Sequence, residues 1–227
     1  MDDKVLAMLQ LQQQLNDATN GKDWEQGVTK NGKTINWKRC IYMECAEMVD
    51  SFAWKHWKSI SAEPDYENLQ IEVVDVWHFV MSLALETFKK NSMGDINVLA
   101  KQIADMDNYA LLYDGCEGFA SQKLILIQIE SVMRDSLQIN LSLTRLLFDF
   151  FELVRMSNLD IDTLYRLYVG KNILNQFRQD NGYKEGSYIK IWGDEEDNAV
   201  MKRLWEENAE LKPQELYSAL EQKYKAL

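Results

Sequence analysis

Only two prolines, Pro64 and Pro213, interrupt a chain of 227 residues. Proline breaks helices because it lacks a backbone N–H and clashes with the preceding turn, so its scarcity leaves room for long helices. The abundant Leu, Gln, Glu, Lys, Met and Ala residues lose little side-chain freedom in a helix. The sequence therefore predicts an all-α fold. No internal repeat or linker composition divides the chain, so one domain over residues 1–227 is expected.

The pattern of apolar residues and turn signals predicts how the helices follow one another. Pro64 in the segment SAEPDYENL suits the first turn of a helix, and the short connection makes the two flanking helices antiparallel neighbours. Gly182, Gly186 and Gly193 fall among Tyr, Lys and Trp, which predicts a loop or lid over 182–193. Helices are expected over 1–17, 35–59, 64–90, 95–114, 117–137, 138–156, 160–180 and 194–227.

The formal net charge of −11 disfavours generic binding of nucleic acids, because phosphate backbones repel an acidic surface. The first residues, MDDKVLAMLQ, do not resemble a signal peptide, and no stretch approaches the roughly 18 apolar residues typical of a membrane span. Cys40, Cys45 and Cys116 are odd in number and lack the spacing of a metal site. We therefore expect free thiols in a cytoplasmic protein that contacts no membrane.

Four carboxylates interrupt two of the most hydrophobic segments. Glu44 and Glu47 lie three residues apart in IYMECAEMV, and Glu72 and Asp75 have the same spacing in LQIEVVDVWHF. This spacing places each pair on one face of a helix, and two antiparallel helices bring both pairs to one place. A carboxylate in apolar surroundings is costly unless it is paired or coordinates a metal ion. Oxygen ligands favour hard cations, so the pattern predicts a Mg²⁺ site.

Two other interpretations of these acids stay open. They can be solvated groups on exposed helix edges, which is the usual place of Glu and Asp. A carboxylate-bridged di-iron centre needs two Glu-x-x-His motifs, and only the pair Asp75 and His78 offers a histidine at that offset. The ligand set therefore favours magnesium over iron.

Further motifs make the chain resemble a known family. Glu44-x-x-Glu47, followed after 24 residues by Glu72-x-x-Asp75, resembles the metal signature of the all-α nucleoside triphosphate pyrophosphatases. The segments LQQQLND, DSFAWKHWKS and YVGKNILNQFRQDNGYKEGSYIKIW are similar to motifs of the dimeric dUTPases within that superfamily. The resemblance implies a helical bundle with a glycine-rich lid near 182–193, two or more Mg²⁺ ions per active site, and a homodimer.

Basic and amide residues gather late in the chain. Lys171, Asn172, Asn175 and Arg178 recur at helical spacing, so they share much of one helix face. Such side chains suit the oxygens of a triphosphate. The alternative interpretation is that they form the solvated, charged end of a helix without a ligand. In the family that the chain resembles, residues matching Asn175, Arg178 and Tyr183 hold the sugar and phosphates. We expect Lys171 and Lys190 to bind the substrate as well.

The resemblance also implies a base pocket. In the family, amides matching Gln13 and Asn16 read the pyrimidine, and positions matching His56 and His78 line the pocket, together with Trp57. Related members often carry Trp at the position of His56, so the chain departs from the family there. Without the resemblance, Gln13 and Asn16 would be surface amides and His78 a core histidine.

The expected reaction is hydrolysis of dUTP, and of dUDP as a second substrate, to dUMP, which keeps uracil out of DNA. By the resemblance, Glu44, Glu47, Glu72 and Asp75 hold Mg²⁺, and Glu47 accepts the proton of the attacking water. Two alternatives stay open. One is a broader pyrophosphatase of the same superfamily that acts on dCTP or modified nucleotides, and the other is a non-catalytic helical interaction protein.

Overall fold

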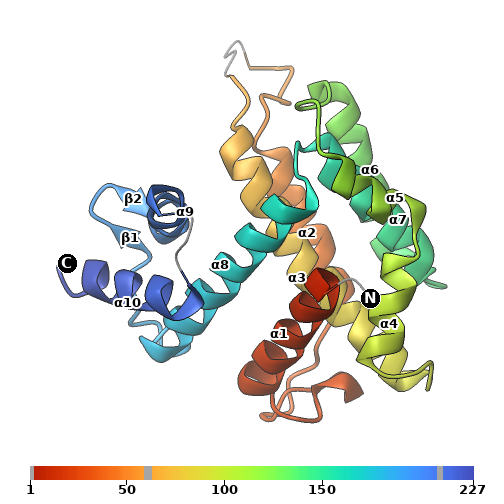
Figure 1. Ribbon diagram of the computed structural model, residues 1–227, viewed down its shortest axis with the longest axis horizontal. Coiled ribbons are helices and arrows are strands. Elements are labelled where there is room, and N and C mark those ends of the chain that lie inside the picture. The colour runs from red at the N-terminus through yellow and green to blue at the C-terminus, as the bar shows by residue number, and fades with distance from the viewer. Residues whose placement is uncertain (1–2, 59–62, 209–211) are drawn as a thin grey trace. The chain divides into compact units, whose positions relative to one another are not determined.

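The computed structural model describes residues 3–58, 63–208 and 212–227, which are mainly helical (Figure 1). The only strands among these residues are the two-residue β1 (Ile191–Trp192) and β2 (Glu195–Glu196), which pair in antiparallel fashion. The expected all-α fold is confirmed. The chain divides into two compact units, Met1–Tyr165 and Arg166–Leu227, and the expectation of a single domain stays a prediction.

The first unit contains most of the helices, and its longest is α3, with 25 residues and buried side chains along almost its whole length. The N-cap Asp65 accepts a hydrogen bond from the backbone N–H of Asn68 at 2.9 Å, which satisfies a donor that the first turn leaves open. The elements of this unit are α1 (Asp3–Asn20), η1 (Trp24–Gln26), α2 (Trp37–Val49), α3 (Tyr66–Lys90), α4 (Ile96–Ala104), α5 (Asp107–Ala110), η2 (Leu111–Asp114), α6 (Gln122–Leu137), α7 (Leu143–Met156) and the start of α8 (Ile161–Asp180).

Trp77 of α3 lies in the core of the first unit. Its ring stacks on Phe150 of α7 with the ring centroids 5.0 Å apart, and its indole nitrogen lies 3.3 Å from the sulfur of Met8 in α1. All three side chains are fully buried. Burying one large apolar side chain such as Phe or Met contributes about 1.5–3 kcal/mol. These contacts therefore hold α1, α3 and α7 together.

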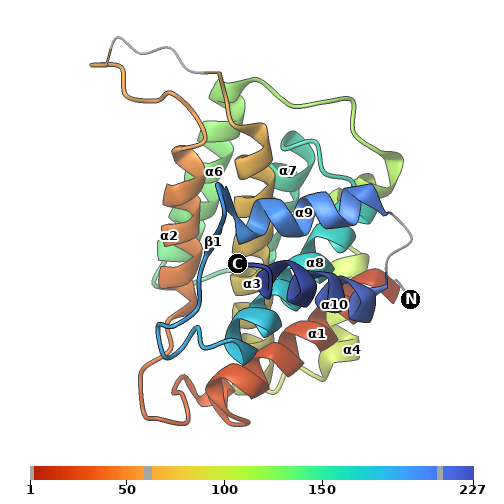
Figure 2. The ribbon, with the colours of Figure 1, turned by 90° about the vertical axis from the view of Figure 1, so that its left-hand side faces the viewer.

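Helices α2 and α3 form an antiparallel pair, as the sequence predicts. The ring of Trp37 at the start of α2 packs on Phe79 in the middle of α3, with the centroids 6.1 Å apart. The hydroxyl of Ser51, just after α2, accepts a hydrogen bond from the side chain of Asn68 at the start of α3 at 3.0 Å. The end of α2 therefore lies beside the start of α3. In addition, α2 packs on α6, and α6 packs on α7 (Figure 2).

The helix expected over 35–59 is shorter than predicted, because α2 ends at Val49 and residues 50–58 form turns. The backbone N–H of Asp65 donates to the carbonyl of Ser51 at 2.8 Å, so the chain has already turned toward α3 at that point. The last residue of the expected helix, position 59, lies outside the described residues.

Several further helix boundaries were predicted wrongly. Pro64 precedes the N-cap Asp65 and does not stand in the first turn of α3, because a helix start favours an oxygen-bearing side chain at the N-cap. The helix expected over 95–114 breaks at Met106, whose backbone is extended (φ −80°, ψ 128°). The break lets the ring of Tyr109 pack on Phe151 with the centroids 5.0 Å apart. Helices α6 and α7 begin later than expected.

The second unit is built around Phe177 of α8. The expected loop over 182–193 consists of turns up to Gly186 and an irregular segment over 187–190 before β1. The short pairing of β1 with β2 was not predicted. The segment expected to be helical over 194–227 contains α9 (Asp197–Glu207) and α10 (Pro213–Tyr224). Ring centroids between 5.4 and 6.2 Å from that of Phe177 belong to Tyr188, Trp192, Tyr217 and Tyr224.

Candidate active site

Three of the four predicted metal ligands come together in the first unit. Glu44 on α2 and Glu72 and Asp75 on α3 each offer a carboxylate oxygen, and these oxygens lie within 4.8 Å of one another. All three side chains are half-buried. The antiparallel pairing of α2 and α3 explains the cluster, since it sets the middle of one helix against the first half of the other.

Carboxylates at this distance repel one another, and a bound cation compensates their charge. Oxygen ligands from two rigid helices suit a hard divalent ion, which accepts carboxylates from separate elements. The cluster of Glu44, Glu72 and Asp75 therefore fits a divalent metal ion.

Glu47 lies one turn after Glu44 on α2 and is exposed. Its carboxylate does not belong to the cluster formed by Glu44, Glu72 and Asp75 among the described residues. The expectation that Glu47 binds metal and takes a proton from water stays a prediction.

The acids begin a row of polar side chains along one face of α3. The polar row consists of Glu72, Asp75, His78 and Ser82, which recur every three or four residues, so one helix face carries them all. Neighbouring positions of α3 are apolar and buried. At about 1.5 Å of rise per residue, roughly 10 Å separates Asp75 from Ser82 along the helix axis.

His78 is buried, and its Nδ1 lies 2.9 Å from the carbonyl oxygen of Val74 one turn earlier. A carbonyl only accepts hydrogen bonds, so Nδ1 carries the proton and donates. In the neutral ring, Nε2 is then the acceptor. The hydroxyl of Ser82 donates to the carbonyl of His78 at 2.8 Å, which ties the end of the polar row to its own helix.

A pair of buried amides from α1 meets the polar row at Ser82. The side chain of Asn16 donates to the hydroxyl of Ser82 at 2.9 Å. Gln12 donates to the same hydroxyl at 3.0 Å and to the side-chain oxygen of Asn16 at 3.3 Å. Gln12 was not predicted from the sequence. Gln12 lies four residues before Asn16, a spacing that places both side chains on one helix face, and this is the sequence signal for the pair.

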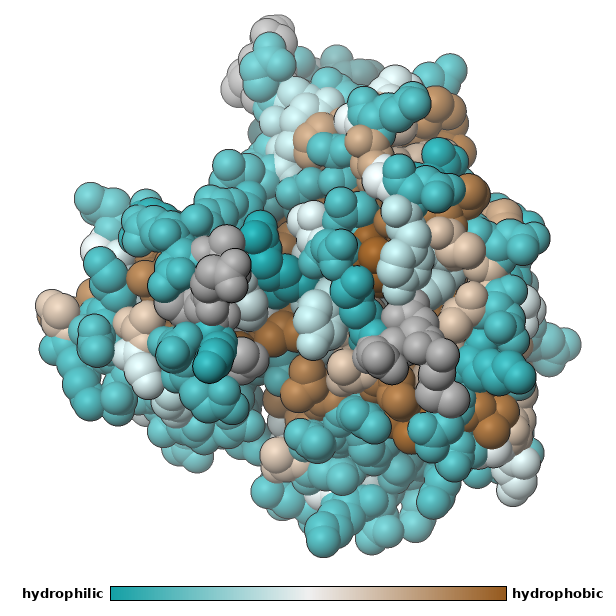
Figure 3. Space-filling view, in the orientation of Figure 1, coloured by the Kyte–Doolittle hydropathy of each residue, from teal (hydrophilic) through white to brown (hydrophobic). Residues whose placement is uncertain are grey.

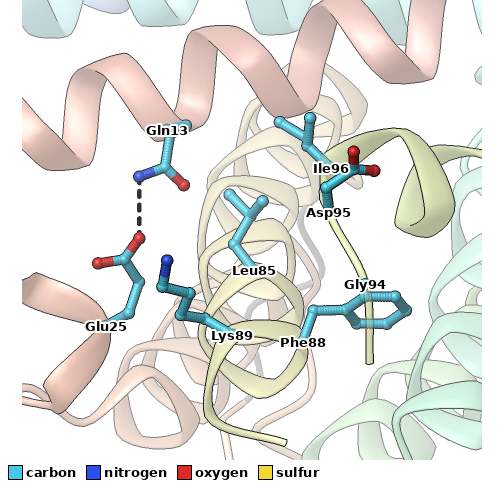
Figure 4. A pocket seen from close by; sticks show the side chains of 8 residues that line it. All are labelled: Gln13, Glu25, Leu85, Phe88, Lys89, Gly94, Asp95 and Ile96. Atoms are coloured by element: carbon cyan, nitrogen blue, oxygen red, sulfur yellow. Dashed lines mark hydrogen bonds between the residues drawn. The ribbon is translucent and has the colours of Figure 1, made fainter. Parts of the chain in front are cut away.

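Gln13 makes different contacts. Its amide nitrogen donates to Asp17 at 3.0 Å and to Glu25 at 3.1 Å, so the structure does not bring Gln13 and Asn16 together. Gln13 lines a hollow of about 450 Å³ at the far end of α3 (Figure 4). The other residues that line it are Glu25, Leu85, Phe88, Lys89, Gly94, Asp95 and Ile96.

His56 and Trp57 lie in the turn after α2 and are exposed, with 63% of Trp57 accessible. The ring of Trp57 packs edge-on against His56 and against Trp54, with centroids 5.1 and 5.5 Å away. The segment that contains His56 and Trp57 follows the end of α2 that lies beside the start of α3. Ser82 lies in the second half of α3. The structure therefore does not place them with the amide pair, and their role in a base pocket stays a prediction.

The predicted phosphate-binding residues lie in the second unit. Arg178 is buried and forms a two-point ion pair with Asp197, while Lys171 donates to the side-chain oxygen of Asn198 at 2.8 Å. The guanidinium carbon of Arg178 lies 5.8 Å from the centre of the Tyr183 ring. Asp197 and Asn198 were missed, although a buried arginine predicts an acidic partner somewhere in the chain.

Lys190 lies in the irregular segment directly before β1. Its amine is 3.7 Å from a carboxylate oxygen of Glu196, and half of its side chain is exposed. An exposed ion pair of this kind contributes little to stability.

The helical fold and the acid cluster on an antiparallel helix pair define a candidate metal-dependent enzyme of the all-α class. A comparison with models of known protein families shows that the family described as dUTPase matches residues 4–183. The chain therefore belongs to the all-α, dimeric type of dUTPase, and it is a hydrolase that acts on dUTP, a nucleoside triphosphate diphosphatase. No curated protein matches it. Within the described residues, no helix is both long and apolar enough to cross a membrane.

Proposed function

We propose that the chain cleaves dUTP with water to dUMP and diphosphate in a Mg²⁺-dependent reaction, accepts dUDP as well, and so keeps uracil out of DNA. The observation that carries the proposal is the cluster of Glu44, Glu72 and Asp75 in a chain that matches the dUTPase family. Phosphoryl transfer needs charge neutralisation and positioning above all, and a convergent set of carboxylates supplies a place for the necessary cations.

Two or more Mg²⁺ ions would be held by Glu44, Glu72 and Asp75, with Glu47 as a further ligand. When bound, they supply polarisation of the phosphoryl oxygens. Glu47 is exposed one turn from Glu44, and in the proposed reaction its carboxylate takes the proton of the attacking water. The rigid helix pair fixes the ligands before substrate arrives, which lowers the cost of binding.

We propose that the nucleotide lies along the polar row. The phosphates lie at its acidic end, and the uracil ring lies at its other end, where Gln12 and Asn16 donate to Ser82. Side-chain amides can both donate to the carbonyl oxygens of uracil and accept from its N3–H. Gln12 therefore joins Asn16 and His78 as a base-pocket residue, beside the predicted Gln13, His56 and Trp57.

The basic residues of the second unit are proposed to bind phosphate oxygens. Arginine and lysine next to amides suit this task, because ionised donors make the stronger hydrogen bonds to phosphate. The segment over 182–193 would act as a lid that excludes water. The residues are Lys171, Asn175, Arg178, Tyr183 and Lys190.

We also propose that the chain forms a homodimer in the cytoplasm and binds no nucleic acid. Apolar side chains are exposed on and just after α6 and on α7, and hydrophobic residues reach the surface of the first unit (Figure 3). A second subunit would cover such a surface. The exposed apolar residues are Leu124, Ile127, Leu137, Ile139 and Phe148. Free cysteines suit a reducing compartment, and the charge of −11 opposes nucleic-acid binding.

Diphosphate release from each of the four common dNTPs and from dUTP, with and without Mg²⁺, tests the proposal. Release is expected from dUTP alone and only with Mg²⁺. The variant Glu47→Gln should lose most of the turnover, whereas Glu130→Gln, which neutralises another exposed helical carboxylate, should keep it.

Three results would change the proposal. Comparable release from dCTP or dTTP would favour a broader pyrophosphatase. No release from any nucleotide, or full turnover by Glu47→Gln, would contradict the proposed chemistry.

A further inference from the structure

Asp197 lies outside the segment that matches the dUTPase family, yet it is the acidic partner of Arg178. Its two carboxylate oxygens accept hydrogen bonds from Nε and Nη2 of Arg178, each at 2.8 Å. Asp197 is fully buried, and 8% of Arg178 is exposed. Two parallel bonds between ionised groups fix the plane of a guanidinium as well as its position.

The carboxylate of Asp197 is itself held in place. Burial and the nearby carboxylate raise the pKa of Tyr188, so its hydroxyl stays protonated and donates to Asp197 at 2.8 Å. The backbone N–H of Asp197 donates to the carbonyl of Lys190 at 3.0 Å. Asp197 therefore connects the end of α8 to the segment around β1.

The other edge of Arg178 faces Asn175. Nη1, the nitrogen that does not contact Asp197, donates to the side-chain oxygen of Asn175 at 3.3 Å. The same amide of Asn175 also carries an NH₂ donor group. Arg178 and Asn175 therefore present donor groups from one turn of α8.

We propose that Asp197 is a positioning residue for phosphate recognition, which holds Arg178 so that Nη1 and Asn175 together meet a phosphate oxygen of the nucleotide. The inference rests on the proposed function, in which Arg178 and Asn175 bind phosphate. A guanidinium that is fixed before binding loses less freedom when the phosphate arrives.

A buried ion pair can also serve stability alone, so thermal stability cannot decide the question. The Michaelis constant can, because a purely structural pair would lower the amount of folded enzyme and leave the KM of the folded fraction unchanged. We therefore choose KM and kcat for dUTP with Mg²⁺ as the readout, measured on protein whose folding is verified by circular dichroism.

Asp197→Asn removes the charge at almost constant shape. The expected result is a rise in KM of about 10- to 100-fold, the range that a misplaced binding group produces. In an Arg178→Met background the same substitution should raise KM no further, since Asp197 acts through Arg178. Asp149→Asn is the matched control, because Asp149 is also a buried carboxylate paired with arginine but lies in the first unit. It should keep the wild-type KM.

A folded Asp197→Asn variant with the wild-type KM would overturn the positioning role. A wild-type KM in Arg178→Met would overturn the phosphate contact on which that role depends. Absence of diphosphate release by the wild-type chain would instead overturn the proposed function.

If Asp197→Asn does not fold, Tyr188→Phe replaces it in the test. This variant keeps both charges and removes one hydrogen bond to the carboxylate. We expect a smaller rise in KM that disappears in the Arg178→Met background, and an unchanged KM would overturn the inference.

Discussion

The side-chain amide of Asn16 donates a hydrogen bond to the hydroxyl of Ser82 at 2.9 Å, across 66 positions of the sequence. Gln12 donates to the same hydroxyl, so two amides of α1 converge on one oxygen of α3. A buried polar group without a partner costs about 1–3 kcal/mol, and these contacts remove that cost. The result is a polar patch within a hydrophobic helix interface, at the end of the row that begins with the acid cluster.

The amide pair leads to a prediction about base recognition. Gln12→Leu should raise the KM for dUTP about 5- to 150-fold, the effect of losing one buried hydrogen bond of roughly 1–3 kcal/mol. Gln13→Leu, the comparison variant one position along, should raise KM less than Gln12→Leu, because Gln13 donates to Asp17 and Glu25 and not to Ser82. Steady-state kinetics with dUTP measure both. A larger effect at Gln13 would contradict the assignment of Gln12.

The sequence predicts the pairing of α2 and α3 because local rules suffice for it. The helical spacing of Glu72 and Asp75 and the short connection before α3 fix which faces meet. The choice between Gln12 and Gln13 does not follow from such rules, since spacings of three and four residues both bring an amide near Asn16. Only the packing of α1 on Ser82 decides it.

Other features depend on contacts between distant residues. The turn after Val49 is fixed by hydrogen bonds that Ser51 accepts from Asp65 and Asn68 near the start of α3. The apolar pattern of the sequence continues past Val49, so it does not reveal where α2 ends. Asp197 meets Arg178 across 19 positions, a pairing that no helical period contains. The acid cluster was therefore predictable in large part, whereas the partners of the basic residues were not.

The buried Asp149 predicts a pH-dependent stability. Burial, together with the neighbouring Asp135, raises the pKa of Asp149 above its ordinary value of 3.8, although Arg145 opposes the shift. Arg134 also faces this carboxylate. Because the folded state binds the proton more tightly, the stabilisation is complete below the ordinary value and is lost as pH rises through the raised one.

Asp149→Asn cannot titrate, so its stability relative to the wild type should increase as pH rises above about 4. Urea unfolding between about pH 4 and pH 7 measures the difference. Asp114→Asn, at an exposed carboxylate, controls for the loss of one negative charge. Parallel pH curves for the wild type and Asp149→Asn would contradict the prediction.

Thiol reactivity should distinguish the cysteines. Burial raises the pKa of the Cys45 thiol far above its ordinary value, and the thiolate is the reactive form. Cys40 and Cys116 are only half-buried. A chromogenic disulfide reagent should therefore modify Cys40 and Cys116 in the folded protein and Cys45 only after unfolding. The three single Cys→Ser variants assign the reactive thiols, and a rate at Cys45 equal to those at Cys40 and Cys116 would show that burial does not protect Cys45.

The most direct test of the central claim measures diphosphate release from dUTP against Mg²⁺ concentration for the wild type and Asp75→Asn. If the cluster of Glu44, Glu72 and Asp75 holds the metal, the wild type requires Mg²⁺, and Asp75→Asn needs at least about 10-fold more of it or loses turnover altogether. Asp162→Asn, at an exposed aspartate, should follow the wild-type curve. Release without Mg²⁺, or the wild-type Mg²⁺ dependence in Asp75→Asn, would contradict the account.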